Sequence, residues 1–395
     1  MNIESGIVYS AAFLFLVKYS RLESITNHIK ARLYQRELDN ALRVLRPPAS
    51  LVDFCSNDYL GFASSARLKE MVLAGLDANP GYTTGSTGSR LISGNDTFTE
   101  DLEQQIADFH QEEAGLIFNS GYAANVGLFS SLAQRGDTII TDELIHASVI
   151  DGARMSHANK YIFKHNDPGS LEEKLKVAKG RIYIAVESVY SMDGDEAPLN
   201  EIAELAEKYG AGLIVDEAHA VGIKGPGGRG CVNLHGLQNT ALARVITFGK
   251  ALGCHGAIVV GSRALRSYLI NFARSFVYST AAAFYTHLSV KMAYQYLQET
   301  DHQVSIEKKI SLFQALSRHL PVAISDSQSA IQGIITCGNE RTKGLSLKLA
   351  SHGFDVRAIL HPTVPAGKER LRVCLHTFNS DEEISGLINT LQNHL

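Results

Sequence analysis

The sequence predicts an α/β fold in which a large domain with a mostly parallel central sheet precedes a smaller C-terminal α+β domain. The chain has 395 residues, more than one ordinary hydrophobic core organises. From Leu51 onward, short apolar runs alternate with stretches of helical spacing, a pattern typical of a parallel sheet covered by helices. After residue 282 this alternation gives way to long helical segments and short strands. We therefore expect an N-terminal helical arm over 1–50, a large domain over 51–282 and a small domain over 283–395.

The expected elements follow in chain order. The arm has charged helical spacing over 18–46, and Pro47 and Pro48 are expected to stop that helix. Runs of about five residues, apolar on both faces, then predict the strands of the sheet. These runs lie at 115–120, 137–141, 160–163, 181–188, 211–219, 244–250 and 257–262.

Helices are expected between and after these strands. The clearest are 171–179 and 197–210, the second ending at Gly210 as a left-handed C-terminal residue. The C-terminal part predicts a helix over 283–300 and another around 342–353. Short strands are expected at 355–359 and 370–375.

Composition and charge narrow the classes of function. Apolar residues make up 45% of the chain and charged residues 20%, which excludes a disordered or low-complexity protein. The net charge of −4 gives no electrostatic case for nucleic acid or for an acidic membrane surface. The apolar run from Ile7 to Val17 is too short to span a bilayer. A small-molecule ligand is therefore the expected partner.

The cysteines predict neither a metal site nor a disulfide framework. There are five of them, an odd number, and none belongs to a closely spaced pair. Free thiols of this kind suit a reducing cytoplasm, which is where we expect the protein.

Polar residues that follow the apolar runs are the first candidates for a site, because ligands bind at the carboxyl ends of parallel strands. Three such ends carry Asp216 with His219, Thr247 with Lys250, and Glu187 with Ser188 and Ser191. Asp216 follows a buried run and needs a cationic partner. Asp216 and Lys250 could form a buried pair that joins two strands. Alternatively, Asp216 binds a protonated ring nitrogen while Lys250 forms an imine with an aldehyde, as in the binding of pyridoxal phosphate.

The order of these residues resembles a known family. His146 in DELIHASVIDGAR, Asp216 and His219 in VDEAHAVG, and Thr247 and Lys250 in TFGKALG resemble the fold-type-I pyridoxal-phosphate enzymes, specifically the α-oxoamine synthases. Further matches in family order are SNDYLGFA, GSTGSRLISG, FNSGYAANVGL, ESVYSMDGDEAPL and PTVPAGKERLRVCL. The resemblance covers roughly residues 20 to 390.

The resemblance implies a role for each matching residue. Lys250 would be the Schiff-base lysine and would move the substrate α-proton, Asp216 would salt-bridge the pyridine nitrogen, and His146 would stack on the ring. His219 and Ser191 would lie near the ring hydroxyl.

The phosphate and substrate groups have their own implied partners. Backbone N–H groups of Gly121 and Tyr122, together with Thr247, would hold the phosphate. Ser279 and Thr280 would reach the phosphate of a neighbouring subunit, which implies a homodimer. The remaining candidates bind substrate: Arg372 would take the amino-acid carboxylate, and Asn57 is a further candidate.

The implied reaction joins a small amino acid to an acyl thioester with loss of carbon dioxide. The best match within the family is the branch that uses L-alanine and a pimeloyl thioester in biotin biosynthesis. Within the family, a glycine-using 2-amino-3-ketobutyrate ligase, a serine palmitoyltransferase and a 5-aminolevulinate synthase remain alternatives, as does a non-catalytic homologue. The acyl carrier, coenzyme A or an acyl carrier protein, stays open.

One departure from the family concerns the acyl chain. Relatives that act on a dicarboxylic acyl chain can have Arg just before PPTVP, where this chain has Leu360-His361-Pro362. A pimeloyl carboxylate would then need another cation. Arg43, at the end of the arm, is our candidate.

Overall fold

The computed structural model describes residues 5–45 and 50–395, and within them seven strands form the central sheet. Their order is β2-β8-β7-β6-β5-β3-β4, and all are parallel except β8, which pairs antiparallel with both neighbours. The strands are β2 (Ala114–Phe118), β3 (Thr138–Asp142), β4 (Asn159–Phe163), β5 (Ile182–Glu187), β6 (Gly212–Asp216), β7 (Ala241–Thr247) and β8 (Ala257–Gly261). Each coincides with one of the seven apolar runs, which confirms the predicted mostly parallel sheet.

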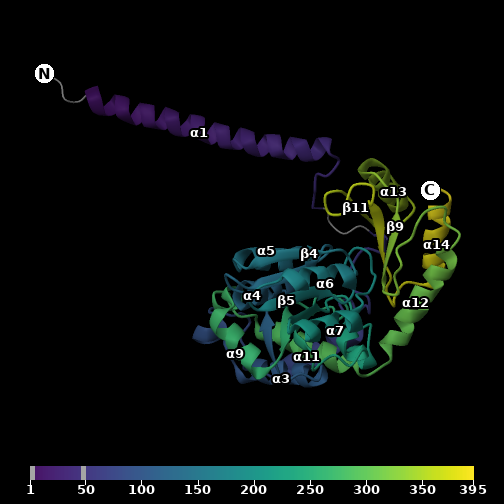
Figure 1. Cartoon of the computed structure of the whole chain (residues 1–395). Coiled ribbons are helices and arrows are strands. Elements are labelled where there is room, and N and C mark those ends of the chain that lie inside the picture. Colours follow the sequence, from purple (N-terminus) through teal and green to yellow (C-terminus); the bar gives the residue numbers. More distant parts are fainter. Residues whose placement is uncertain (1–4, 46–49) are drawn as a thin grey trace.

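Side chains of the sheet alternate between two hydrophobic layers. On one face Ile139, Ala185 and Ile214 pack with residues of α4, α5, α9 and α10, whereas Ile140, Ile184 and Val215 face α6 and α7. The bounds are α4 (Gly121–Leu132), α5 (Ala147–Met155), α6 (Pro168–Val177), α7 (Leu199–Tyr209), α9 (Arg263–Phe272) and α10 (Arg274–Val277). Helices therefore cover both faces of the sheet (Figure 1).

Helix ends follow local sequence signals. Gly210 ends α7 with φ 61°, the left-handed conformation predicted for it. The other elements of this part are α2 (Ala66–Asp77), α3 (Thr97–Phe109), the short helical segments η1 (Arg90–Gly94) and η2 (Pro226–Gly228), and α8 (Cys231–Leu234).

The first helix, α1 (Ser5–Leu38), extends away from the rest of the protein (Figure 1). The prediction that the arm helix runs to residue 46 is wrong, and Pro47 and Pro48 lie outside the described residues. Asn40 adopts φ 51°, while its N–H bonds to the carbonyl of Glu37 and the N–H of Ala41 bonds to that of Arg36. This paired pattern closes a helix at a left-handed residue. Among the helices that the structure describes, α1 included, we find none with enough length and apolar character to cross a membrane.

The C-terminal part holds a three-stranded antiparallel sheet of order β11-β12-β9. Its elements are α11 (Phe284–Leu297), α12 (His302–Ser317), β9 (Ile331–Ile335), α13 (Asn339–Ser351), β10 (Phe354–Asp355), β11 (Arg357–Ile359), β12 (Arg370–Cys374) and α14 (Asp381–Gln392). The chain segment just after the arm joins this part, because β1 (Val52–Asp53) pairs parallel with β10. The division at residue 282 stays a prediction. The pairing of β1 with β10 brings residues 52–59 close to the C-terminal strands.

Candidate active site

Lys250 lies at the end of a hydrogen-bonded chain of side chains beyond the carboxyl end of β7. Its Nζ is 2.7 Å from Nε2 of His219, and Nδ1 of His219 is 2.7 Å from the hydroxyl of Tyr59. That hydroxyl donates to Oδ1 of Asn57 over 3.1 Å. The Tyr59 oxygen is therefore free to accept the Nδ1–H of His219, which leaves Nε2 to accept from Lys250.

Burial sets the charge states along this chain. It lowers the pKa of His219 well below its ordinary value, and the positive charges of Lys250 and Arg372 add to that effect. Burial also lowers the pKa of Lys250, although the nearby carboxylates of Asp216 and Glu187 oppose this. A neutral His219 beside a lysine of lowered pKa gives Lys250 a larger share of the unprotonated amine, which is the nucleophilic form.

Arg372 contacts the same chain of side chains at Asn57. It is on β12, is 7% exposed, and donates to the carbonyl of Ser191 over 2.7 Å and to Oδ1 of Asn57 over 3.0 Å. Asn57, Ser191 and Arg372 thus come together from segments as much as 315 residues apart. These contacts fix the direction of a guanidinium that could bind a carboxylate.

Asp216 ends β6, directly opposite Glu187 at the end of β5. Its carboxylate accepts one hydrogen bond from Nδ2 of Asn125 over 2.8 Å and another from the N–H of Ala218 over 3.0 Å. Within the described chain we find no ion pair between Asp216 and Lys250, so the alternative in which they join two strands is not supported. Burial raises the pKa of Glu187, and the charge of Asp216 adds to that rise.

His146 precedes α5 as its N-terminal capping residue. Its Nδ1 lies 2.7 Å from the hydroxyl of Ser148 and accepts the Ser148 N–H over 3.2 Å. Burial lowers the pKa of His146, with the negative charge of Asp216 acting against it and Lys250 acting with it. The ring is therefore held neutral near Asp216 and Lys250.

The first turn of α4 offers the features of an anion site. A Cβ on Gly121 would come within 2.5 Å of Oγ1 of Thr247, so glycine is needed where β7 meets the helix start. Gly121 and Tyr122 are the first two residues of the helix, and their N–H groups belong to its unpaired first turn. The Tyr122 hydroxyl bonds outward to Asp151. The backbone of these residues and the hydroxyl of Thr247 fit a phosphate group.

Three predicted residues are not joined to this group in the single chain. Ser279 donates to the carbonyl of Ser275, and Thr280 is exposed. Arg43 donates from Nη2 to Oγ1 of Thr363 over 3.2 Å. Arg43 therefore lies against the segment that follows Leu360.

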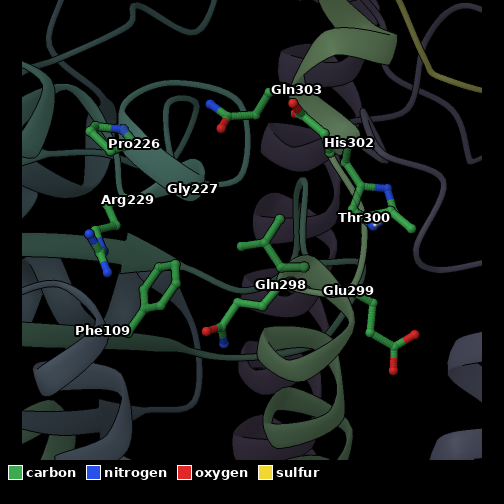
Figure 2. A pocket seen from close by; sticks show the side chains of 11 residues that line it. Phe109, Pro226, Gly227, Arg229, Gln298, Glu299, Thr300, His302 and Gln303 are labelled. Carbon is green, nitrogen blue, oxygen red and sulfur yellow. Dashed lines mark hydrogen bonds between the residues drawn. The ribbon is translucent and has the colours of Figure 1, made fainter.

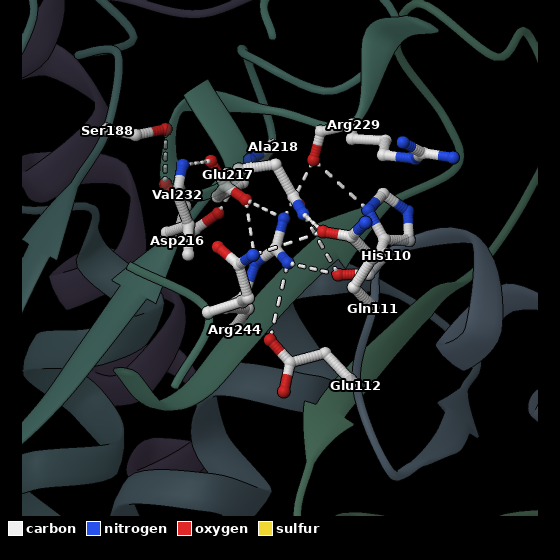
Figure 3. Close-up of polar contacts among 12 residues, drawn as sticks. His110, Gln111, Glu112, Ser188, Asp216, Glu217, Ala218, Arg229, Val232 and Arg244 are labelled. Atoms are coloured by element: carbon white, nitrogen blue, oxygen red, sulfur yellow. Dashed lines mark hydrogen bonds and ion pairs between the residues drawn. The ribbon is translucent and has the colours of Figure 1, made fainter. Parts of the chain in front are cut away.

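A buried ion pair involves Glu217, the residue that follows Asp216 (Figure 3). The guanidinium of Arg244, on β7, pairs with Glu217, and both side chains are fully buried. Arg244 also donates to the carbonyls of His110 and Arg229 and to Glu112. Burial raises the pKa of Glu112 to about 7, although Arg244 opposes the rise. The ionic link between β7 and the end of β6 thus uses Arg244 and Glu217.

A second charged cluster, made of His165, Asp142 and Asp195, contacts the loop that carries Ser191. His165 contacts Asp142 at 2.9 Å and Asp195 at 2.6 Å. Burial lowers the pKa of His165, but the two carboxylates outweigh burial and raise it to about 9. The charged ring ties the ends of β3 and β4 to the loop after β5.

A pocket of about 510 Å³ lies between η2 and the link from α11 to α12 (Figure 2). The labelled residues include Phe109, Arg229 and Gln303, and its lining contains none of the predicted site residues. Arg229 also accepts a hydrogen bond from Arg244 through its backbone carbonyl. The described chain also contains no group of three or more His, Cys, Asp or Glu side chains suited to a metal ion.

The sequence prediction missed several residues that support the site. They are Tyr59, Asn125, Ser148, Glu217 and Arg244. Tyr59 and Asn125 stand within quoted motifs, SNDYLGFA and FNSGYAANVGL, but an isolated tyrosine or asparagine has no sequence signal that separates a structural from a functional role.

Comparison with known proteins places the chain in a family. The family description "Aminotransferase class I and II" matches residues 49–391, so the chain belongs to that family. It is 43% identical to the 8-amino-7-oxononanoate synthase of Emericella nidulans over 88% of this chain and 90% of the relative. This identity confirms the resemblance to the α-oxoamine synthases.

Solved structures agree with the fold. The 8-amino-7-oxononanoate synthase of Francisella tularensis is 28% identical with a TM-score of 0.75, over 87% of this chain and 97% of that one. The Sphingomonas wittichii serine palmitoyltransferase is 26% identical with a TM-score of 0.83, over 95% and 97%. The predicted fold-type-I class is confirmed.

Proposed function

We propose that this enzyme condenses L-alanine with a pimeloyl thioester, releasing carbon dioxide and forming 8-amino-7-oxononanoate for biotin biosynthesis. The 43% identity to a synthase of that name supports this reaction. The single structural observation that carries it is the hydrogen-bonded chain from Lys250 through His219, Tyr59 and Asn57 to Arg372. This chain joins a candidate nucleophile to a candidate carboxylate-binding group.

The cofactor of the enzyme is pyridoxal phosphate, and the site fits it. The missing Cβ of Gly121 lets the Thr247 hydroxyl approach the start of α4, where it and the backbone N–H groups of Gly121 and Tyr122 would hold a phosphate. Asp216 presents a carboxylate already fixed by two donors. When bound, pyridoxal phosphate supplies an electron sink for negative charge at the α-carbon of an amino acid. Asp216 would hold the proton of the ring nitrogen, and His146 would lie against the ring.

The chain's own residues then bind the substrate and move its proton. Arg372 would bind the L-alanine carboxylate, because its guanidinium is oriented by Ser191 and Asn57. Nζ of Lys250 would take the α-proton, since burial lowers its pKa to about 8 and so enlarges the share of unprotonated amine. His219 would accept a hydrogen bond from Nζ and so hold it in place.

Arg43 is our candidate for the far end of the acyl chain. It contacts Thr363, three residues after Leu360, and Leu360 stands where relatives that act on a dicarboxylic acyl chain can have arginine. We expect Arg43→Ala to raise KM for the pimeloyl thioester and to leave the spectral change caused by L-alanine unaltered. Arg32→Ala, which removes another exposed arginine from the arm, is the matched control. An unchanged KM would refute the assignment.

A homodimer is also part of this proposal. Apolar side chains near Thr280 are strongly exposed, with Ile92 at 84% and Tyr278 at 72%. A second copy would cover these side chains while bringing Ser279 and Thr280 to its phosphate site. Sedimentation equilibrium should give twice the chain mass, and a monomer would contradict the proposal. The five free thiols support a cytoplasmic location.

Serine palmitoyltransferase is the second candidate. The structure of the Sphingomonas wittichii enzyme matches this chain with a TM-score of 0.83, and that of the Francisella synthase matches with a TM-score of 0.75. Assays that cross alanine, glycine and serine with pimeloyl, palmitoyl and acetyl thioesters separate the candidates. Each thioester should be offered on coenzyme A and on acyl carrier protein. We expect the highest kcat/KM with L-alanine and pimeloyl thioester. A preference for serine with palmitoyl thioester would overturn the proposal.

A further inference from the structure

Two buried side chains connect Asp216 to His146. Asn125, on α4, donates from Nδ2 to Asp216 over 2.8 Å and to the Ser148 hydroxyl over 3.0 Å. The Ser148 hydroxyl in turn lies 2.7 Å from Nδ1 of His146. Asn125 is 2% exposed and Ser148 is fully buried, so water does not compete for these contacts.

The donors and acceptors along this connection can be assigned in only one direction. The Asp216 carboxylate accepts hydrogen bonds, so the amino group of Asn125 must face it. The second N–H of that group occupies an acceptor site of the Ser148 oxygen, and the Ser148 hydrogen is left to donate to His146. Nδ1 of His146 also accepts the backbone N–H of Ser148 over 3.2 Å. A ring nitrogen that accepts carries no hydrogen, so the hydrogen of the neutral ring is on Nε2.

Burial of the Asn125 amide destabilises the fold, and packing alone does not explain why an amide stands at this position. Oδ1 of Asn125 is buried and has no hydrogen-bond partner in the described chain. An unpaired buried oxygen destabilises a fold, so an apolar side chain would suit the position better if it served only the core. The amide is explained by what its amino group does for Asp216 and Ser148.

We propose that Asn125 and Ser148 are positioning residues that hold His146 as the neutral Nε2–H tautomer and fix its ring relative to the Asp216 carboxylate. This inference rests on the proposed function, in which both residues address the cofactor ring. The charged groups that face His146 are Asp216 and Lys250, and Glu187 lies beside its backbone. Because the His146 ring is then neutral, the charge that faces the ring nitrogen of the cofactor is the negative charge of Asp216.

The tautomer can be measured directly. Nitrogen-15 solid-state NMR on histidine-labelled apoenzyme distinguishes Nδ1–H from Nε2–H, and His146→Gln identifies the His146 signals by their loss. We expect the wild type to show an unprotonated Nδ1. Ser148→Ala removes the hydroxyl at 2.7 Å and leaves only the longer backbone N–H contact at 3.2 Å, so it should give a mixture of tautomers. Ser148→Thr, which retains a hydroxyl, should restore the wild-type signal. Ser131→Ala, which removes a hydroxyl on α4 that donates to the carbonyl of Leu128, is the matched control.

A second readout uses the loaded enzyme without substrate. The pH midpoint of the cofactor's visible absorption band should shift by about half a unit or more in Asn125→Leu and in Ser148→Ala, but not in Ser131→Ala. An Nδ1–H signal in the wild type, or a Ser148→Ala variant that matches the control in both measurements, would overturn the inference. Neither readout needs L-alanine or a thioester, so an enzyme inactive on those substrates could still show the tautomer.

Discussion

Replacing Asp216 by asparagine separates the chemical role of this carboxylate from its structural role. Both oxygens of Asp216 accept a hydrogen bond, one from Asn125 at 2.8 Å and one from the N–H of Ala218 at 3.0 Å. Asp216→Asn keeps one acceptor and replaces the other with an amino group. Because both partners are donors, one of the two hydrogen bonds must be lost.

The substitution lowers both the stability of the fold and the catalytic rate, by different amounts. A buried donor left without an acceptor costs about 1–3 kcal/mol of folding free energy. The neutral amide also cannot stabilise the charged ring nitrogen, and loss of such a transition-state contact costs about 3 kcal/mol or more, roughly a hundredfold in rate. We therefore expect a folded, modestly destabilised protein with at most about one hundredth of the wild-type kcat.

The assay compares kcat with L-alanine and pimeloyl thioester against the urea unfolding midpoint of the cofactor-free protein. Asp101→Asn, on the exposed face of α3, is the matched control and should leave both unchanged. A variant with near-normal kcat would show that Asp216 is structural and would refute the reasoning. An unaltered unfolding midpoint would show that the two hydrogen bonds contribute little to stability.

Three further predictions follow from named contacts. Lys250→Ala should abolish turnover, and borohydride reduction of the wild type should attach the cofactor to the Lys250 peptide, whereas labelling of another lysine would contradict the assignment. Arg244→Met should destabilise the protein by about 3–5 kcal/mol in urea unfolding, because it leaves the buried Glu217 carboxylate unpaired. Adding Glu217→Gln should recover part of that loss; a double variant no more stable than Arg244→Met would argue against the ion pair. For His165, whose pKa is raised to about 9, charge stabilises the fold fully below about pH 6.5, and this contribution is lost as pH rises through 9. The free energy of unfolding of wild type should therefore fall between about pH 6.5 and 9, and that of His165→Gln should not. Parallel pH curves for the two proteins would contradict this prediction.

The strands and the catalytic core were predictable because their signals are local. Each strand of the central sheet is a short apolar run, Asp216 ends one of these strands, and Lys250 lies three residues beyond the end of another. Gly210 ended its helix as expected for the same reason: a left-handed residue needs no information from the rest of the chain.

The end of the arm helix and the supporting polar residues were not predictable in this way. Two prolines gave the stronger stop signal at 47 and 48, but the weaker preference of Asn40 for the left-handed conformation ended the helix first. Asn125 and Glu217 act through partners 91 and 27 residues away. Their roles depend on which strands become neighbours, and no local pattern carries that information.

The fate of the carboxyl carbon of L-alanine tests the central claim most directly. The purified enzyme would be given alanine labelled with carbon-13 at its carboxyl carbon together with pimeloyl thioester, and both gas and product would be measured by mass spectrometry. We expect one labelled carbon dioxide for each unlabelled 8-amino-7-oxononanoate formed. Pyruvate that retains the label, as a simple amino-group transfer would give, would contradict the account.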